Sequence, residues 1–199
     1  GFMAGHSAIR RVVMGSRAVG EAATDQEVRS MKALLAESLS DGALGFSSSL
    51  STTHNDALGQ PVPSRHAEFN EILELAKTVG EHEGTSIEFL PGVGIFDDQL
   101  RQLMSDLSTT SQRPVNWNVL NPGSEEQMEN QLGTSDIAKK NGGKVVALTM
   151  PQPVVLRLNL HGGMVFDAME GWAELFELSI PERIDKLSQP TMRKQLDAS

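Results

Sequence analysis

The sequence predicts an α/β protein built from about four consecutive parallel β/α units. Short apolar segments alternate along the chain with longer segments of helical periodicity. Most of these changes of period coincide with a helix cap or a Gly/Pro turn. A hairpin signal is missing before residue 154. Strands that alternate with helices are joined by right-handed crossovers and therefore lie parallel in one sheet.

The first predicted unit begins at a capping box. The Thr24 hydroxyl and the Glu27 carboxylate can each satisfy a free backbone N–H at a helix start. Apolar residues then recur at helical spacing from Val28 to Leu39, and Gly42 ends the run. The short apolar segment 43–47 predicts a buried strand.

The next units repeat the same order of elements. Phe69 begins a second amphipathic helix that ends near Gly84, and residues 85–90 predict a strand that Pro91 stops. A third helix follows Asp97 and Asp98, whose negative charge suits a helix N-terminus.

Two more strands complete the predicted sheet. They cover residues 114–120 and 144–150, and a fourth helix between them begins at a second capping box, Ser124 to Gln127. Residues 1–150 are therefore expected to form the central β/α units of one domain. Four units are too few to close an eight-stranded barrel, which needs about 200 residues or more, so a small open sheet and the middle of a larger barrel both remain open.

The last part of the chain differs from the units before it. After a possible strand over 154–160, an apolar helix is expected over 166–176, and Ser179 to Glu182 opens another helix. Residues 151–199 are predicted to be a helical lid or cover of the same domain. The opening GFMAGHS has no initiator Met and no start signal of an element, so the chain is expected to be a segment of a longer protein.

Composition excludes several functions. A net charge of −9, from 17 Lys plus Arg and 26 Asp plus Glu, argues against general binding to nucleic acid or anionic membranes. An apolar run of the length of a membrane span is absent from the sequence. The chain has no Cys, which excludes disulfides, a thiolate nucleophile and Cys-bound zinc, and a cytoplasmic location is the default expectation.

Ligands of parallel α/β proteins bind at the carboxyl ends of the strands. Glu88 stands out there, because a carboxylate inside an apolar strand is costly to bury unless it is paired or binds a metal. Alternation places Glu88 on the face opposite Ile87 and Phe89. An ion pair with a neighbouring Lys or Arg is an equally good explanation. Asn118 ends the next strand and is the second candidate for the reaction centre.

The loop after the first predicted strand concentrates hydrogen-bonding groups. His54, Asn55 and Asp56 are predicted to bind substrate, with Ser48 at the strand end. The alternative for the cluster is an Asx-type turn, because Asn and Asp bond their own backbone. Arg65 could hold a substrate carboxylate through its fork of donors.

Several of these segments resemble the D-aminoacylases, the N-acyl-D-amino-acid deacylases of the amidohydrolase superfamily. The likeness covers most of residues 4–120 and, less specifically, the rest. The matching segments are Gly5-His6-Ser7-Ala8-Ile9-Arg10, Val13-Met14-Gly15, Ala22-Ala23-Thr24, Gly42-Ala43-Leu44-Gly45-Phe46-Ser47-Ser48, Thr53-His54-Asn55-Asp56, Pro61-Val62-Pro63-Ser64-Arg65 and Met150-Pro151-Gln152-Pro153.

The resemblance implies part of a (β/α)8 TIM-type barrel that hydrolyses the amide of an N-acyl-D-amino acid. It also implies a divalent metal, zinc being the expected one, with key ligands outside this chain. Zinc would lower the pKa of a bound water and polarise the acyl oxygen. Under this interpretation the isolated segment is expected to be inactive.

The chain departs from the family at the metal site. Where typical members carry ligand histidines, it has Ser86-Ile87-Glu88-Phe89 and Val115-Asn116-Trp117-Asn118-Val119, and Thr52 replaces a typical Tyr. Glu88 is the best candidate for a metal ligand among these residues, although zinc prefers nitrogen and sulfur.

The predicted function is therefore hydrolysis of an N-acyl-D-amino acid, with a small molecule as the partner. One alternative is another amidohydrolase that acts on a cyclic amide or a different C–N bond. The other is a barrel that kept the scaffold without metal or chemistry. Unpaired edge strands of a sheet segment would also favour self-association into a homo-oligomer.

Overall fold

The structure is a computed structural model that describes residues 1–56, 59–120, 123–153, 155–163, 165–166, 169 and 171–197. It divides into two compact units. The first contains Gly1–Ser51 and Pro63–Pro153, and the second contains Thr52–Val62 and Val154–Ser199. The first unit carries the sheet, and the second carries the C-terminal helices and the segment that includes His54 to Asp56.

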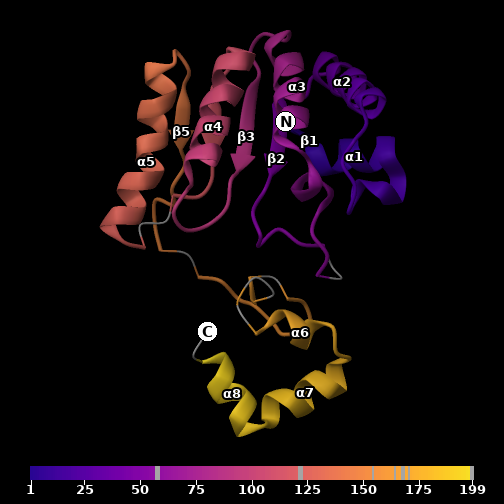
Figure 1. The fold of residues 1–199 in the computed structure, drawn as a ribbon, viewed down its shortest axis with the longest axis vertical. Helices are drawn as coiled ribbons and strands as arrows, with labels where there is room; N and C mark the ends of the chain where they lie inside the picture. Colours follow the sequence, from indigo (N-terminus) through magenta and orange to yellow (C-terminus); the bar gives the residue numbers. More distant parts are fainter. Residues whose placement is uncertain are drawn as a thin grey trace. The chain divides into compact units, whose positions relative to one another are not determined.

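The first unit is built on a five-stranded parallel sheet (Figure 1). Its strand order follows the sequence without interruption, and each strand pairs in parallel with the next. This arrangement contains four consecutive crossovers and confirms the predicted succession of about four parallel β/α units. The strands are β1 (Ala4–Gly5), β2 (Gly45–Ser49), β3 (Ser86–Leu90), β4 (Val115–Trp117) and β5 (Val145–Ala147).

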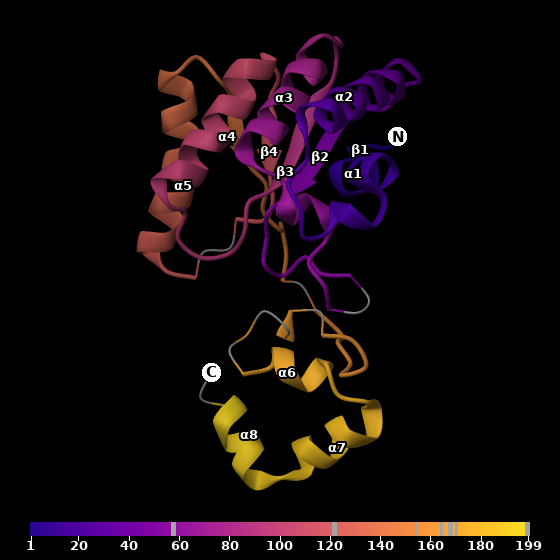
Figure 2. The ribbon, with the colours of Figure 1, turned by 45° about the vertical axis from the view of Figure 1, so that its right-hand side comes forward.

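The helices of this unit lie on one face of the sheet (Figures 1 and 2). Each crossover moves one strand position in the same direction, and right-handed crossovers of that kind place every helix on the same side. A doubly wound sheet would carry helices on both faces. The helices are α1 (His6–Met14), α2 (Asp25–Ser40), α3 (Phe69–Gly80), α4 (Asp98–Ser111) and α5 (Glu125–Lys140), with 3-10 turns η1 (Gly15–Ala18) and η2 (Pro63–His66).

Strand register separates the two faces of the sheet. Phe46 pairs with Ile87 and Ile87 with Val115, and these side chains are fully buried in the core against the helices. Ser47 pairs with Glu88 and Glu88 with Asn116 on the opposite, helix-free face.

The predicted helix caps form. Thr24 and Glu27 make a complete capping box at α2, Asp97 caps α4, and the Ser124 hydroxyl accepts a hydrogen bond from the Gln127 backbone at α5. The apolar segment expected as a strand over 43–47 is displaced, since β2 begins at Gly45 and continues through three serines.

The second unit contains the short helices α6 (Ala173–Phe176), α7 (Ile180–Ser188) and α8 (Pro190–Leu196). The capping box of Ser179 and Glu182 at α7 is confirmed. Arg183, which is 6% exposed, donates to the backbone carbonyls of five residues of its own unit, Leu160, His161, Leu175, Phe176 and Leu178. This buried guanidinium therefore connects residues 160–161 to the end of α6 and the chain after it through backbone hydrogen bonds.

Two predictions for the second unit are wrong. Residues 155–160 do not form the strand expected over 154–160; Val154 itself lies outside the described residues. In the described part of the apolar helix expected over 166–176, only Ala173–Phe176 is α-helical. Among the described residues, the helices are too short or too polar to cross a membrane.

Candidate active site

Glu88 and Asn118 meet on the helix-free face of the sheet. Asn118 follows β4 directly, and its Nδ2 donates to Glu88 Oε1 at 2.5 Å. Both side chains are half-buried. Because Ile87 and Phe89 take the helix side of β3, Glu88 is turned away from the outer helices, as strand alternation predicts.

The environment of Glu88 favours its protonated form. Burial raises the pKa of the Glu88 carboxyl, and the hydrogen bond from Asn118 offsets part of that rise. Among the described residues, no Lys or Arg forms an ion pair with Glu88, so the alternative of a neutralising cation is not seen there. A raised pKa makes a carboxyl a better general acid or base, because it exchanges its proton more readily.

The His54 segment belongs to the second unit. Asp56 Oδ1 accepts a hydrogen bond from the Gln60 backbone at 3.0 Å, and the Asp56 backbone N–H donates to the Gln60 carbonyl at 2.7 Å. Asp56 therefore bonds the backbone of its own loop, as the alternative for this cluster supposes, but four residues on and not the two residues of an Asx turn. Asn55 makes an antiparallel bridge to Pro61, and the Val62 N–H donates to the His54 carbonyl at 3.3 Å.

Arg65 lies in η2, within the first unit, and is half-buried. The hydroxyl of the adjacent Ser64 donates to the Ser49 carbonyl at 2.8 Å, and the Ser7 hydroxyl donates to Ser64 Oγ at 3.0 Å. These bonds attach η2 to the carboxyl end of β2 and to the start of α1. Substrate contacts by His54, Asn55, Asp56 and Arg65 remain predictions.

A second polar cluster lies on the helix side of the sheet. His6 Nδ1 is 2.8 Å from Ser48 Oγ, and His6 Nε2 is 2.7 Å from Glu71 Oε1. Arg10 donates to the other Glu71 oxygen and, at 2.8 Å, to the Glu21 carbonyl. His6, Arg10 and Glu71 are at most 3% exposed. We refer to Ser48, His6, Glu71 and Arg10 as the buried relay.

The pKa shifts of His6 and Glu71 indicate where the protons of the buried relay lie. Burial lowers the pKa of His6, so the ring is neutral. Burial on its own would raise the pKa of Glu71, but hydrogen bonds from His6 and Arg10 outweigh it and hold that pKa below its ordinary value. The neutral ring therefore donates from Nε2 to the Glu71 carboxylate and accepts the Ser48 hydroxyl proton at Nδ1.

This hydrogen-bond order is that of a Ser-His-acid triad, but its location points to a structural role. Ser48 is 7% exposed and lies on the helix side of β2, whereas a nucleophile must reach substrate. Arg10 also neutralises Glu71. The predicted contact of Ser48 with substrate remains a prediction; Ser47 has the strand position that faces Glu88.

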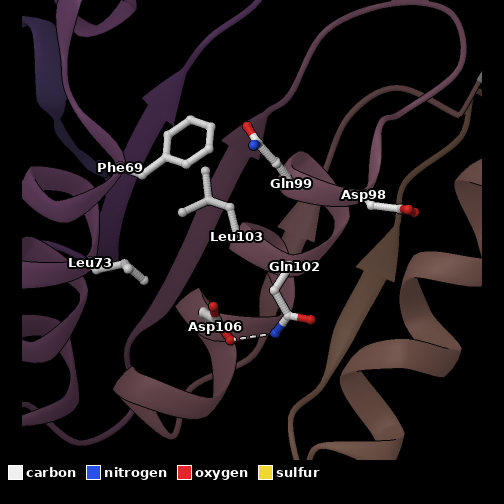
Figure 3. Close-up of a pocket in the computed structure, with 7 residues that line it drawn as sticks. All are labelled: Phe69, Leu73, Asp98, Gln99, Gln102, Leu103 and Asp106. Carbon is white, nitrogen blue, oxygen red and sulfur yellow. Dashed lines mark hydrogen bonds between the residues drawn. The ribbon is translucent and has the colours of Figure 1, made fainter.

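The structure also contains a recess of about 600 Å³ between α3 and α4. Phe69 and Leu103 point toward one another there, and Gln102 donates to Asp106 at 2.7 Å (Figure 3). All its lining residues belong to these two helices. This recess lies in the outer helix layer, and none of the predicted site residues line it.

The described residues do not by themselves fit a zinc centre. None of their His, Asp and Glu side chains gather in a group of three or more that could hold a metal. Asn118 turns its NH₂ toward Glu88, which leaves Glu88 as a lone carboxylate ligand among groups that favour harder cations.

Two known enzymes share this fold. One is a D-aminoacylase described as defining a novel subset of amidohydrolases, with a TM-score of 0.53 and 23% identity over 75% of this chain and 30% of that one. The other is an N-acyl-D-glutamate deacylase from Bordetella bronchiseptica in complex with zinc and a phosphonate inhibitor. It has a TM-score of 0.54 and 19% identity over 74% of this chain and 30% of that one.

A further D-aminoacylase structure of equal similarity concerns a binuclear metal centre. No protein-family model and no curated protein matches the chain. The fold is that of part of a (β/α)8 barrel, which confirms the expected fold class and the structural likeness to D-aminoacylases. The chain spans 30% of the length of these enzymes.

Sequence reasoning missed the buried relay. Glu71 and His6 are separated by 65 positions, so the sequence around one of them does not indicate that it contacts the other. The one available signal was the inward side of the second predicted helix, where Glu71 precedes the buried Ile72. A carboxylate at such a position needs a partner.

Proposed function

We propose that the complete protein containing this chain hydrolyses the amide C–N bond of N-acyl-D-amino acids or closely related amides. The observation that carries the proposal is the Glu88–Asn118 pair. It combines a carboxyl of raised pKa with a positioned amide donor, on the helix-free face of a barrel segment shared with deacylases.

Glu88 would move the proton that amide hydrolysis requires. In its ionised form it accepts a proton from the attacking water as the water oxygen bonds to the acyl carbon. It then returns this proton to the nitrogen as the C–N bond breaks, giving a carboxylic acid and an amine. A raised pKa brings the carboxyl nearer to the operating pH, where proton transfer in both directions is efficient.

Asn118 would position Glu88. Its Nδ2–H fixes Oε1, which leaves Oε2 as the oxygen for proton transfer. Ser47 and Asn116 occupy the paired positions on the same face and would supply polar contacts near the reacting atoms. His54, Asn55, Asp56 and Arg65 keep their proposed role in substrate binding, with Arg65 holding the substrate carboxylate. Ser48, which is buried on the helix side against His6, is assigned to the stability of the fold instead.

A divalent metal, zinc by analogy with the N-acyl-D-glutamate deacylase, enters the proposal only through ligands elsewhere in the complete protein. Metal analysis of the purified protein tests that part independently of turnover. Metal-free protein that still hydrolyses substrate would remove the metal from the proposal, whereas metal-free protein without hydrolysis would favour the scaffold alternative.

The experiment compares Glu88→Gln with Glu37→Gln in the complete protein. Glu37 is an exposed carboxylate of α2, so this variant is a matched control for the loss of one charge. Release of free amine is measured from N-acetyl derivatives of D- and L-amino acids and from cyclic amides. We expect Glu88→Gln to lose roughly 10²- to 10⁴-fold in kcat, with Glu37→Gln unchanged.

Two results would contradict this proposal. Equal rates for wild type and Glu88→Gln would remove Glu88 from the reaction. Turnover confined to cyclic amides would assign the protein to the first alternative. Near-ultraviolet circular dichroism of both variants controls for misfolding.

A further inference from the structure

The loop that joins β3 to α4 presents two aliphatic side chains to solvent. Val93 is 70% exposed and Ile95 is 57% exposed. The loop, residues 91–97, leaves the sheet at the carboxyl end of β3, the strand that carries Glu88. Ligands of parallel β/α folds bind at this edge.

The backbone of this loop is hydrogen-bonded to α5 on both sides of Ile95. Asn130 of α5 bonds the backbone of Phe96 twice, accepting from its N–H at 2.7 Å and donating to its carbonyl at 3.0 Å. Gln131 Nε2 donates to the Gly94 carbonyl at 2.6 Å. Gly94 has a φ of 82°, which a residue with a side chain rarely adopts.

The attachment uses buried groups. Phe96 is 2% exposed and packs edge-on against the fully buried Trp117, with ring centroids 5.2 Å apart. Gln131 is also 2% exposed, although a buried helix position is usually apolar. Because its amide bonds the loop, α5 gives up apolar packing to fix the backbone that presents Val93 and Ile95.

The carboxyl edge of the sheet carries further exposed apolar residues. Val119 follows β4, and Leu148 and Met150 follow β5, at 36%, 40% and 55% exposure. Apolar surroundings with a few placed polar groups are typical of a small-molecule site. A rigid apolar wall also lowers the entropy lost on binding, since the loop is ordered in advance.

We propose that Val93 and Ile95 form an apolar wall of the substrate site and bind an aliphatic group of the substrate. The proposal rests on the proposed function and adds a substrate preference to it. Amides that carry an aliphatic extension, on the acyl side or on the amino-acid side, bind better than their small parent because the extension covers these two side chains.

The test compares the double variant Val93→Ser/Ile95→Ser with Val12→Ser in the complete protein. Val12 is 72% exposed on α1, so it is a matched control for an exposed aliphatic residue. N-acetyl-D-alanine is the parent, and N-acetyl-D-leucine and N-hexanoyl-D-alanine are the extended ligands. We expect the preference for at least one extended ligand to fall roughly tenfold or more, with the parent little changed.

A second readout separates this proposal from the function on which it rests. Calorimetric binding of the same three ligands is measured in a Glu88→Gln background, where turnover is not needed. If wild type hydrolyses none of them but the preference in binding falls in the double variant, the reaction is refuted and the wall stands. If the preference is unchanged, or wild type shows no preference in binding, the wall is overturned whatever the activity.

A third comparison tests the attachment. Gln131→Leu keeps the volume of the side chain and removes the bond to Gly94. We expect a raised KM for the extended ligand with kcat largely kept, because a mobile loop weakens binding without changing the reacting groups. An unchanged KM would show that the bond does not fix the wall.

Discussion

The two faces of the sheet bury carboxylates in different ways. On the helix side, Glu71 is held by His6 and Arg10 and its pKa is lowered. On the helix-free side, Asn118 is the one donor to Glu88 in the described part of the chain, and the pKa of Glu88 is raised. Both groups are partly or fully removed from water, so the difference comes from the partners.

This difference suits Glu71 to a role in stability and Glu88 to a role in proton transfer. A carboxylate with a charged partner in the core stays ionised and fixes the elements that it joins. A carboxyl whose partner is neutral can change its protonation state near working pH. The helix side resembles a catalytic triad in its hydrogen bonds, yet the side with fewer bonds is the better candidate for proton transfer.

The largest effect on stability is expected from Glu71→Ala. It leaves the Arg10 charge buried without its partner carboxylate, and breaking a buried pair of this kind typically costs about 3–5 kcal/mol. Urea unfolding of the complete protein, followed by circular dichroism, measures the loss.

Glu74→Ala is the control for Glu71→Ala. Glu74 lies on the same helix and pairs with Lys32 and Lys77 near the surface, where an ion pair contributes about 1 kcal/mol or less. Equal losses for the two variants would show that the buried relay does not stabilise the fold.

A smaller loss is expected from Ser48→Ala. It leaves His6 Nδ1 buried without a donor, and an unsatisfied buried acceptor costs about 1–3 kcal/mol. Ser47→Ala, one position along the strand on the other face, is expected to change the free energy of unfolding by no more than about 0.5 kcal/mol. If Ser47→Ala were the more destabilising, the assignment of the two faces would be wrong.

Most of the first unit could be predicted from the sequence because its buried positions are apolar. The helices α2 to α5 and the strands after β1 follow from periodicity, caps and turn residues. The placement of Glu88 and Asn118 on one face follows from alternation alone. The hydrogen bond between Asn118 and Glu88 could not be predicted, because its two residues lie on β3 and directly after β4, 30 positions apart.

The missed helix α1 shows where this reasoning fails. Its buried positions are His6, Ile9, Arg10 and Met14, so charged or polar residues occupy half of its inner face. These polar residues break the hydrophobic pattern of a helix. His6 and Arg10 can be buried because both bond Glu71 on α3. The predicted strand over 43–47 stopped short of Ser48 and Ser49 for the same reason, because Ser48 is buried by bonding His6.

In the second unit the apolar pattern was present but a backbone feature overrode it. Gly171 has a φ of 78°, which is incompatible with a continuous α-helix, and α6 begins only after it. Phe166 and Trp172 instead stack with ring centroids 4.8 Å apart. Of the described apolar residues in this stretch only Leu175 is buried, and Met169 is 38% exposed, so helical spacing here predicted neither a continuous helix nor a buried face.

The buried relay also predicts a pH dependence of stability. The pKa of His6 is lowered by folding from its ordinary value of 6.5, so just below that pH the unfolded state binds more protons and stability falls as pH falls. Glu71 acts in the same direction near and below 4.5. Glu88, with its raised pKa, acts in the opposite direction above 4.5.

Thermal unfolding of wild type and of His6→Asn between pH 5 and 8 separates these contributions. Asn cannot titrate, so the loss of stability between pH 6.5 and 5 should be smaller in the variant than in wild type. Equal slopes would show that His6 is not the group that binds the proton on unfolding.

The smallest effect is expected at Asn118. The hydrogen bond from Asn118 lowers the pKa of Glu88, so Asn118→Ala should move that pKa further upward, because only burial remains. In the proposed reaction the ionised Glu88 accepts the proton from water, and the acidic limb of the kcat/KM profile should therefore move to higher pH. Asn116→Ala, at the neighbouring strand position, should leave that limb in place. A limb that moves to lower pH in Asn118→Ala would mean that the amide does not stabilise the carboxylate, and that the pair is held together by a protonated Glu88 instead.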